Sequence, residues 1–251
     1  MDQRKKREKS FHNKIFEEKT RIEAHKYHSV ATRGQNFYKH LLLKNCNNKQ
    51  VLDYGCGTGD FSILLAKNGA GGVTGIDLSD VAINMANAKI VDSTLGENIS
   101  FHVMDAENLT FNNNTFDLVY GMAILHHLDL KKCYSEIARV LKPNGMAIFL
   151  EPLGHNLLIN LYRKYTPHLR TKDEHPLLMH DLDLAKNYFN KTNFNYYHLF
   201  SFLAVPFRNL TFFSYFVSVL DKIDSYIFKM FPYVRRHAWI VIEALSKPKK
   251  N

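Results

Sequence analysis

The stretch VLDYGCGTGD, residues 51–60, places three glycines at alternate positions directly behind a short apolar run. The apolar run predicts a short buried strand over residues 49–55. Glycine suits positions where the backbone turns sharply or lies against a ligand, so the glycines predict a binding loop. Apolar residues at helical spacing then predict a helix over 60–70, with Gly69 near its end. A strand, a glycine loop and a helix in this order indicate a ligand site at the carboxyl end of the strand.

Strands and helices alternate on both sides of this loop. Further strands are predicted at 72–77, 99–105, 116–122, 146–152 and 238–245, and helices at 8–28, 33–45, 79–91, 130–145 and 181–193. Such alternation forms βαβ units, in which helices cover both faces of a parallel sheet. The sequence therefore predicts an α/β fold with a Rossmann-like, doubly wound, mostly parallel sheet of seven strands. The expected additions are N-terminal helices and a helical lid inserted late in the chain.

The composition limits the classes of protein to which the chain can belong. The chain has 251 residues, of which 45% are hydrophobic, and this is enough for one folded core. Much of its net charge of +9 lies in RKKREK at 4–9 and KPKK at 247–250, and chain ends are usually solvated. Nucleic-acid binding needs a basic patch on a folded face, so we expect no nucleic-acid partner.

Cysteine usage and the N-terminal sequence favour a cytoplasmic protein. Cys46, Cys56 and Cys133 form no CxxC pair, and an odd number of cysteines gives no disulfide framework. The charged N-terminus lacks the apolar centre of a signal peptide. The longest apolar segment, 202–220, is interrupted by a proline, an arginine and an asparagine, so it is not expected to cross a membrane.

Acidic residues close the two strands that follow the glycine loop. Asp77 ends the second predicted strand, 22 residues after Gly55, where a carboxylate accepts hydrogen bonds from a ribose diol. Asp105 ends the third strand, where it can accept a hydrogen bond from an exocyclic amine. The carboxyl ends of parallel strands lie at one edge of the sheet, so we expect these groups around one ligand.

Five segments in order resemble the class I S-adenosylmethionine (SAM)-dependent methyltransferases of the small-molecule type. They are VLDYGCGTGD, GIDLSD, VMDAENLTF, FDLVYGMAILHHLDL and EIARVLKPNG. The resemblance covers residues 25–152 and implies SAM as the methyl donor and S-adenosylhomocysteine as the product. The strand–helix alternation stops after Pro152. We therefore expect one structural domain with four parts: an N-terminal helical cap (1–48), a SAM-binding core (49–152), a cap or lid insertion for the acceptor (153–236), and a last strand with a basic tail (237–251).

The resemblance implies cofactor roles for the loop and the second strand. Gly55 and Gly57 would let the backbone lie along the methionine part of SAM. Asp53 would orient the loop or face the amino group of SAM. Asp77 would hold the ribose hydroxyls, and Leu78 would pack on the adenine.

Further cofactor roles fall on the later strands and on the N-terminal helix. The resemblance implies that Asp105 takes the adenine amine and that the backbone of Ala106 meets the ring edge. Gly121 and Met122 would line the region near the sulfonium, and Tyr27 would close over the cofactor.

A nicotinamide dinucleotide is the main rival ligand. That site normally has the pattern GxGxxG, whereas this loop has an acid, Asp53, before its first glycine. A dinucleotide also needs a helix N-terminus that takes a pyrophosphate, and Asp60 at that place would repel one. Two other interpretations are a SAM-binding scaffold without catalysis and a nucleic-acid methyltransferase, which the absence of an NPPY-like tetrapeptide after the fourth strand disfavours.

Histidines after the fourth and fifth strands are the candidate catalytic groups. Methyl transfer needs an aligned nucleophile and, for a hydroxyl, a base, and the ordinary pKa of histidine suits that task. His126 and His127 follow the fourth strand, and Glu151 and His155 follow the fifth. His175 completes this set of candidates. A base with an orienting carboxylate, an Arg clamp for an anion and a polar loop with salt links all fit the pattern.

The segment 151–176 also holds the candidate substrate-binding residues Arg163, His168 and Arg170. It contains no close metal-binding template, so no metal is expected. The run TPHLRTKDEHPL resembles a subset of bacterial methyltransferases with an inserted cap.

The aromatic segment 194–233 has two interpretations. It is a helical lid over the pocket, or an apolar face that touches a membrane or a lipid-like acceptor. The sequence as a whole predicts methyl transfer from SAM to a small-molecule or lipid-linked acceptor. Oxygen is the first choice of acceptor atom, with nitrogen or carbon as alternatives. Whether the chain is a monomer or a homodimer stays open.

Overall fold

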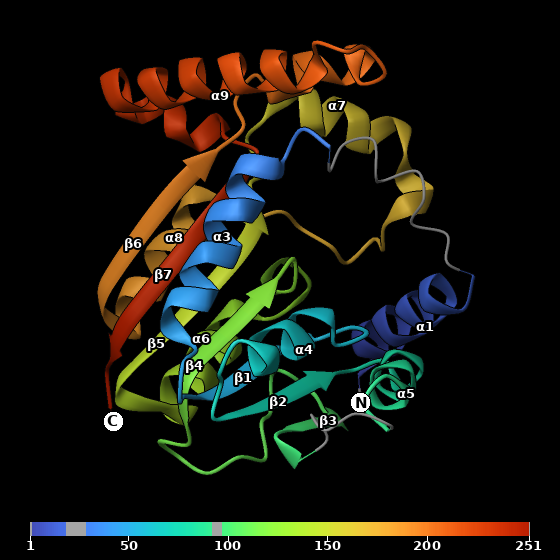
Figure 1. Ribbon diagram of the computed structural model, residues 1–251, viewed down its shortest axis with the longest axis vertical. Helices are drawn as coiled ribbons and strands as arrows, with labels where there is room; N and C mark the ends of the chain where they lie inside the picture. The colour runs from blue at the N-terminus through green and yellow to red at the C-terminus, as the bar shows by residue number, and fades with distance from the viewer. Residues whose placement is uncertain (1, 19–28, 92–96, 251) are drawn as a thin grey trace.

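The computed structural model describes residues 2–18, 29–91 and 97–250. Its centre is a seven-stranded sheet in the order β3-β2-β1-β4-β5-β7-β6 (Figure 1). The strands are β1 (Gln50–Tyr54), β2 (Gly72–Asp77), β3 (Ile99–Val103), β4 (Phe116–Met122), β5 (Leu141–Pro152), β6 (Phe189–Tyr197) and β7 (Ile240–Pro248). Strand β7 runs antiparallel to both of its neighbours, β5 and β6, and the remaining strand pairs are parallel. The predicted Rossmann-like sheet is confirmed.

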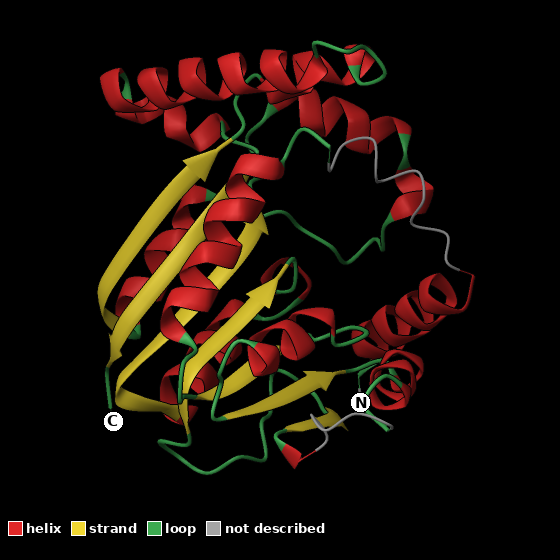
Figure 2. Cartoon of the chain, viewed as in Figure 1, coloured by secondary structure: helices red, strands yellow, loops and turns green. Residues whose placement is uncertain are grey.

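Helices cover both faces of this sheet (Figure 2). Among the described residues the α-helices are α1 (Gln3–Glu18), α3 (Thr32–Asn45), α4 (Asp60–Lys67), α5 (Asp80–Ala88), α6 (Leu130–Val140), α7 (Leu157–Tyr165), α8 (Met179–Leu184) and α9 (Phe213–Met230). Successive residues of β1 point to opposite faces. Val51 packs in the core with α3, α4 and α5, whereas Leu52 packs in the core with α6 and α8. Strands buried on both faces explain the continuous apolar runs in the sequence.

Strand β6 begins inside the segment 181–193, for which the sequence predicts a helix. The structure has α8 and a 3-10 turn there, and then β6 begins at Phe189. The helix prediction is therefore wrong from Phe189 onward. Aromatic residues favour strands, and β6 pairs with β7 from Phe189 to Tyr197, so tertiary pairing decides this segment. As a result, β6 separates α7 and α8 from α9 within the predicted cap.

Two other helix bounds differ from the prediction. The predicted helix 130–145 ends at Val140, because Leu141 already pairs with Phe116 in an extended β5. The predicted helix 8–28 begins earlier, at Gln3, and α1 ends at Glu18. Residues 19–28, including Tyr27, lie outside the described residues.

The basic N-terminus is not simply solvated, which corrects the sequence-based expectation. Arg4 forms an ion pair with Glu107, and Lys5 Nζ lies 2.7 Å from Asp105 Oδ2. Arg7 forms a further ion pair with Asp173 at 2.7 Å. These contacts hold α1 against the carboxyl edge of the sheet, beside α5 (Figure 1).

A buried carboxyl group in β7 predicts a pH dependence of stability. Glu243 is fully buried, and burial raises its pKa to about 8, with Glu151 as a further cause. Between about pH 4.5 and 8 the folded state keeps a proton that the unfolded state loses, so stability falls as pH rises through that window. The expected slope is on the order of 1.4 kcal/mol per pH unit.

Urea unfolding at pH 5 and pH 7.5, compared between the wild type and Glu243→Gln, measures this slope. The amide introduced by this substitution has no acidic proton. Its oxygen still accepts the hydrogen bond that Tyr134 donates to the native carboxyl at 3.0 Å. We expect the variant to lose the part of the pH dependence that Glu243 causes, whereas Asp53 and Asp224, whose pKa values burial raises to about 6, contribute in both proteins. Equal slopes in both proteins would contradict the assignment.

Candidate cofactor and acceptor site

The glycine loop turns tightly at the end of β1. Gly55 has φ +80°, and a Cβ there would lie 2.8 Å from the side chain of Ile124. Asp53 lies beneath the loop, where its carboxylate accepts a hydrogen bond from Ser62 Oγ at 2.7 Å. Burial raises the pKa of Asp53 to about 6. This geometry ties the loop to α4 and favours the loop-orienting role of Asp53 over contact with a ligand.

The ends of β1, β2 and β3 surround one cavity, which we call the loop pocket. Asp77 Oδ2 accepts from Gly57 N at 2.9 Å, and Asp77 Oδ1 accepts from Ser79 N at 2.8 Å. These two hydrogen bonds fix the carboxylate of Asp77 at the rim of the loop pocket. The predicted cofactor residues that line the loop pocket are Gly55, Gly57, Asp77, Leu78, Asp105, Ala106 and Met122.

Gly121 lies behind this pocket. Its carbonyl accepts from Tyr38 Oη at 2.8 Å, and a Cβ would lie 2.7 Å from Tyr54 O. Gly121 therefore provides space where β4 passes β1, and its neighbour Met122 lines the pocket.

Helix α1 supplies pocket residues that the sequence analysis missed. Glu8, Lys9, His12 and Phe16 line the loop pocket. These positions share one helix face, but the sequence does not show which strand ends that face covers. The signal in the sequence that could have placed α1 here is its charge, because Arg4 and Lys5 of the basic run form ion pairs with Asp105 and Glu107.

A second cavity, the cap pocket, lies between the sheet edge and the cap. Its lining is Phe11, His12, Gln35, Met122, Ala123, His126, His127, Leu150, Pro152, Ile159, Tyr162, Arg163, Leu169, Arg170, Glu174, Phe202, Trp239 and Ile240. His12, Met122, Ala123 and His127 line both pockets. The two pockets therefore meet beside the end of β4.

His126 is held by a buried carboxylate. Its Nδ1 lies 2.7 Å from Glu151 Oε2, and Glu151 is 0% exposed. Glu151 Oε1 accepts from the backbone N–H groups of Ile124 and Leu125, both at 2.9 Å. Glu151 lines neither pocket, and its carboxylate contacts His126 and the backbone. Burial lowers the pKa of His126, which favours the neutral imidazole near pH 7.

In the neutral ring, a proton on Nδ1 is donated to Glu151, and Nε2 then carries the lone pair. His126 Nε2 lies 3.9 Å from Glu174 Oε1, which is itself paired with Arg163 at 2.6 Å. The basic nitrogen of His126 thus belongs to the polar side of the cap pocket.

His127 lies at the junction of the two pockets. Its Nδ1 is 3.1 Å from Glu8 Oε2, and its ring centroid is 4.2 Å from that of His126. Ligand atoms of Glu8, His12 and His127 lie within 4.8 Å of one another, as do those of His126, His127 and Glu174. That spacing would admit a metal ion, so the absence of a metal stays a prediction.

The two predicted arginines line the cap pocket. Arg170 donates to the carbonyl oxygens of Arg163 and Thr166, both at 2.6 Å, and its guanidinium carbon lies 5.8 Å from the ring centroid of Tyr162. Among the described residues no carboxylate forms an ion pair with Arg170. The charge of this guanidinium is therefore available to an anionic ligand.

His155, His168 and His175 are not brought to either pocket. His155 Nε2 accepts from Met179 N at 3.3 Å, which joins the end of β5 to α8. His168 and His175 are exposed. Only the backbone of His175 approaches the site, where its N–H donates to His126 O at 3.0 Å.

Residues 51–145 match the family model described as a methyltransferase domain. The demethylmenaquinone methyltransferase of Lactiplantibacillus plantarum is 37% identical over 108 residues, which are 42% of this chain and 46% of that protein. The ubiquinone biosynthesis O-methyltransferase of Coxiella burnetii is 36% identical over 115 residues, which are 45% and 47% of the two chains. These matches span about half the length of the curated relatives.

Solved structures share the fold over a longer part of the chain. Phosphoethanolamine N-methyltransferase 2 of Haemonchus contortus has a TM-score of 0.61 and 21% identity, and the match covers 84% of this chain and 52% of that one. Geranyl diphosphate C-methyltransferase of Streptomyces coelicolor has a TM-score of 0.58 and 14% identity over 86% and 80% of the two chains. Strand order and the matched segments agree: residues 51–145 form a methyltransferase domain of the class I SAM-dependent type, and the cofactor of this domain is SAM.

Proposed function

We propose that this chain transfers a methyl group from SAM to a hydroxyl oxygen of a small-molecule or lipid-linked acceptor. SAM occupies the loop pocket, and the acceptor occupies the cap pocket. Support comes from the shared lining at Met122, Ala123 and His127, where the two ligands would meet. Apolar residues such as Ile159, Phe202 and Trp239 make the cap pocket suitable for a lipid-like acceptor.

The observation that carries this proposal is the 2.7 Å contact between Glu151 and His126. Nε2 of His126 accepts the hydroxyl proton as the oxygen attacks the methyl carbon in line with the leaving sulfur. A C–O bond forms, the C–S bond breaks, and S-adenosylhomocysteine leaves as a neutral thioether. Glu151 stabilises the imidazolium that results, as a carboxylate does in a base–orienter pair.

Arg170 and Arg163 would bind an anionic group of the acceptor. Glu174 already neutralises Arg163, which leaves Arg170 as the cation for that group. A guanidinium binds carboxylate or phosphate through charge-assisted hydrogen bonds. The proposal gives no role to His155, His168 or His175, whose side chains line neither pocket.

Asp77→Ala should weaken SAM binding by about 1–3 kcal/mol, because it removes a charged acceptor from the ribose hydroxyls. Isothermal titration calorimetry with SAM measures the change. Asp60→Ala is the matched control, since this carboxylate on α4 is exposed and lies outside the loop pocket. Equal affinity in the wild type and Asp77→Ala would remove the ribose role.

Methyl transfer itself is tested with SAM that carries a deuterated methyl group and a panel of acceptors. The panel pairs phenols, amines and activated carbon nucleophiles, each with and without an alkyl tail and an anionic group. We expect the label on an oxygen of an anionic, apolar compound, and the position of the label in the product separates O- from N- or C-methylation. SAM binding without product from any compound would instead favour a non-catalytic scaffold.

A further inference from the structure

The outer face of α9 carries an apolar stripe that begins at its N-cap residue, Phe212. Its members recur every three or four positions: Phe212, Tyr215, Val219, Ile223, Tyr226 and Met230. Tyr215 is 75% exposed and Tyr226 is 65% exposed. The opposite face of α9 packs inward through Val217, Leu220 and Phe228. Since one apolar stripe already anchors the helix, the fold does not need the second one.

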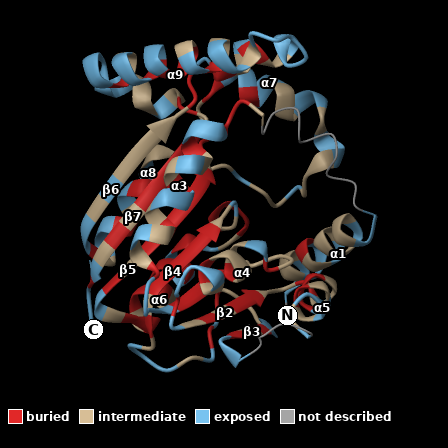
Figure 3. Cartoon of the chain, in the orientation of Figure 1, coloured by how far each residue is buried: buried red, intermediate tan, exposed pale blue. Residues whose placement is uncertain are grey.

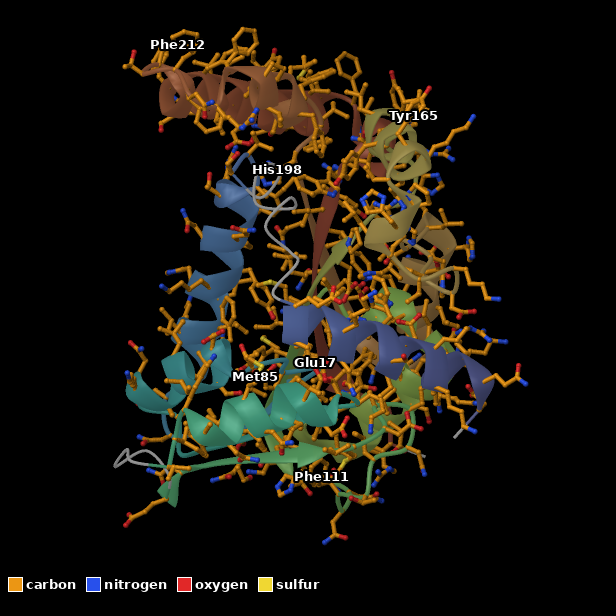
Figure 4. All side chains as sticks on the ribbon, turned by 90° about the vertical axis from the view of Figure 1, so that its right-hand side faces the viewer. Glu17, Met85, Phe111, Tyr165, His198 and Phe212 are labelled. Atoms are coloured by element: carbon orange, nitrogen blue, oxygen red, sulfur yellow. The ribbon has the colours of Figure 1, made fainter. Side chains whose placement is uncertain are left out.

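Neighbouring elements extend this stripe into a broader surface. Exposed large apolar residues also lie on α7, on the 3-10 segments η6 (Ser201–Phe207) and η7 (Pro232–His237), and beside them: Leu157, Leu158, Leu161, Tyr165, Leu203, Phe207, Leu210, Phe231 and Tyr233. Together with the α9 stripe they form what we call the outer cap surface. The exposed colouring of α9 and α7 marks its position in Figure 3, and Figure 4 places Phe212 and Tyr165 at the end of the molecule far from Phe111.

The exposed charges of this part of the cap all have one sign. Between residues 200 and 236 the exposed charged side chains are Arg208, Lys222, Lys229 and Arg236. The two acids of the segment, Asp221 and Asp224, are buried. Asp224 accepts from the backbone N–H of Leu199 at 2.8 Å, and Asp221 pairs with His198 at 3.2 Å. Both carboxylates therefore make their contacts inside the protein. The outer cap surface carries apolar and cationic side chains.

We propose that the outer cap surface docks on an anionic lipid membrane. An amphipathic helix with exposed aromatic and aliphatic residues and flanking lysines lies in the plane of a bilayer interface. Lysine and arginine beside that face are attracted by anionic headgroups. A second copy of this chain would bring the same cations against one another, so charge favours a membrane over a homodimer at this face.

The docking surface adjoins the acceptor site. Helix α7 contributes Ile159, Tyr162 and Arg163 to the cap pocket, and η6 contributes Phe202. The same elements also carry exposed apolar residues of the outer cap surface. An acceptor held in the bilayer would thus enter between α7 and η6 with its anionic group toward Arg170. This part of the inference rests on the proposed function and specifies its acceptor as a membrane-resident amphiphile.

Co-sedimentation of the full chain with vesicles tests the docking without any methyl transfer. The vesicles contain phosphatidylcholine alone or an equal mixture with phosphatidylglycerol, and no SAM or acceptor is added. We expect binding to the mixed vesicles that weakens as salt rises, because salt screens the attraction. No binding of the wild type to mixed vesicles would overturn the proposal.

Variants separate the two parts of the surface. Ile223→Ser combined with Tyr226→Ser should weaken binding roughly tenfold or more, through lost apolar burial. Lys222→Glu combined with Lys229→Glu should weaken it at least as much, and only on anionic vesicles. Matched controls are Val91→Ser and Lys67→Glu, exposed residues outside the cap. Thermal unfolding verifies that each variant is folded.

Four outcomes decide between the interpretations. Loss of binding in the cap variants and not in the controls supports the proposal. Equal binding in all the variants overturns it. A dimer in solution that the combined Ile223→Ser and Tyr226→Ser variant abolishes, without vesicle binding by the wild type, assigns the surface to a second copy instead. Vesicle binding by a protein that methylates nothing would leave the docking intact and reject the proposed function alone.

Discussion

His126→Ala is expected to lower turnover by about 10²- to 10³-fold, because it removes the base that takes the acceptor proton. SAM affinity should stay close to that of the wild type, since His126 lies in the cap pocket and does not line the loop pocket. Single-turnover methyl transfer with the acceptor from the labelled-methyl screen measures the rate. Calorimetry with SAM measures the affinity.

His168→Ala is the matched control for this prediction. His168 is also on the cap side of the chain, but it is exposed and lines neither pocket. We expect wild-type turnover from it. Parallel losses of SAM affinity, turnover and thermal stability in His126→Ala would show a structural role and contradict the assignment of a base.

Glu151→Ala should destabilise the fold by about 3–5 kcal/mol, in addition to lowering turnover. The substitution leaves the N–H groups of Ile124 and Leu125 and the ring of His126 without their shared acceptor in a fully buried site. Urea unfolding at pH 7 measures the loss. An alanine variant as stable as the wild type would contradict the hydrogen bonding described above.

Glu151→Gln distinguishes stability from catalysis. The amide oxygen of the introduced glutamine still accepts from the Ile124 and Leu125 backbone, so most of the stability should remain. Its amide nitrogen donates to His126 Nδ1, which moves the ring proton to Nε2 and removes the basic lone pair from the cap pocket. We expect a folded protein that binds SAM normally and turns over at least about 10²-fold more slowly. Wild-type turnover in this variant would show that the carboxylate does not position a base.

The sequence supports the cofactor half of the site best. Asp77 ends β2, and Asp105 follows the end of the neighbouring parallel strand β3 by two residues. Such strand ends share one edge of the sheet, so local patterns are enough to bring the two acids together. The glycine loop adds a backbone requirement that few residues other than glycine meet, as φ +80° at Gly55 shows. Periodicity and turn chemistry therefore predict these positions without knowledge of the packing.

The acceptor half depends on tertiary contacts that no local pattern encodes. Glu151 was predicted as a catalytic group, yet its carboxylate faces His126 and two backbone amides instead of a pocket. His175 and His126 offer the same chemistry in the sequence, but only the second is buried at the site. Likewise, β6 has the aromatic residues of a lid helix and becomes a strand because β7 offers it a partner.

Within residues 2–18, 29–91 and 97–250, none of the helices combines the length and the hydropathy of a membrane-spanning segment. In the proposed docking, the apolar stripe of α9 and its flanking lysines lie at the bilayer interface. The two proposals together give the aromatic cap two functions. Its inner face would hold the acceptor, and its outer face would meet the bilayer.

Calorimetric titration of the full chain with S-adenosylhomocysteine, and in parallel with NADH, tests the central claim most directly. The loop pocket, with acids at the ends of β2 and β3, predicts one S-adenosylhomocysteine site per chain that Asp77→Ala weakens. It also predicts no heat from NADH. Binding of NADH with no binding of S-adenosylhomocysteine would contradict the account.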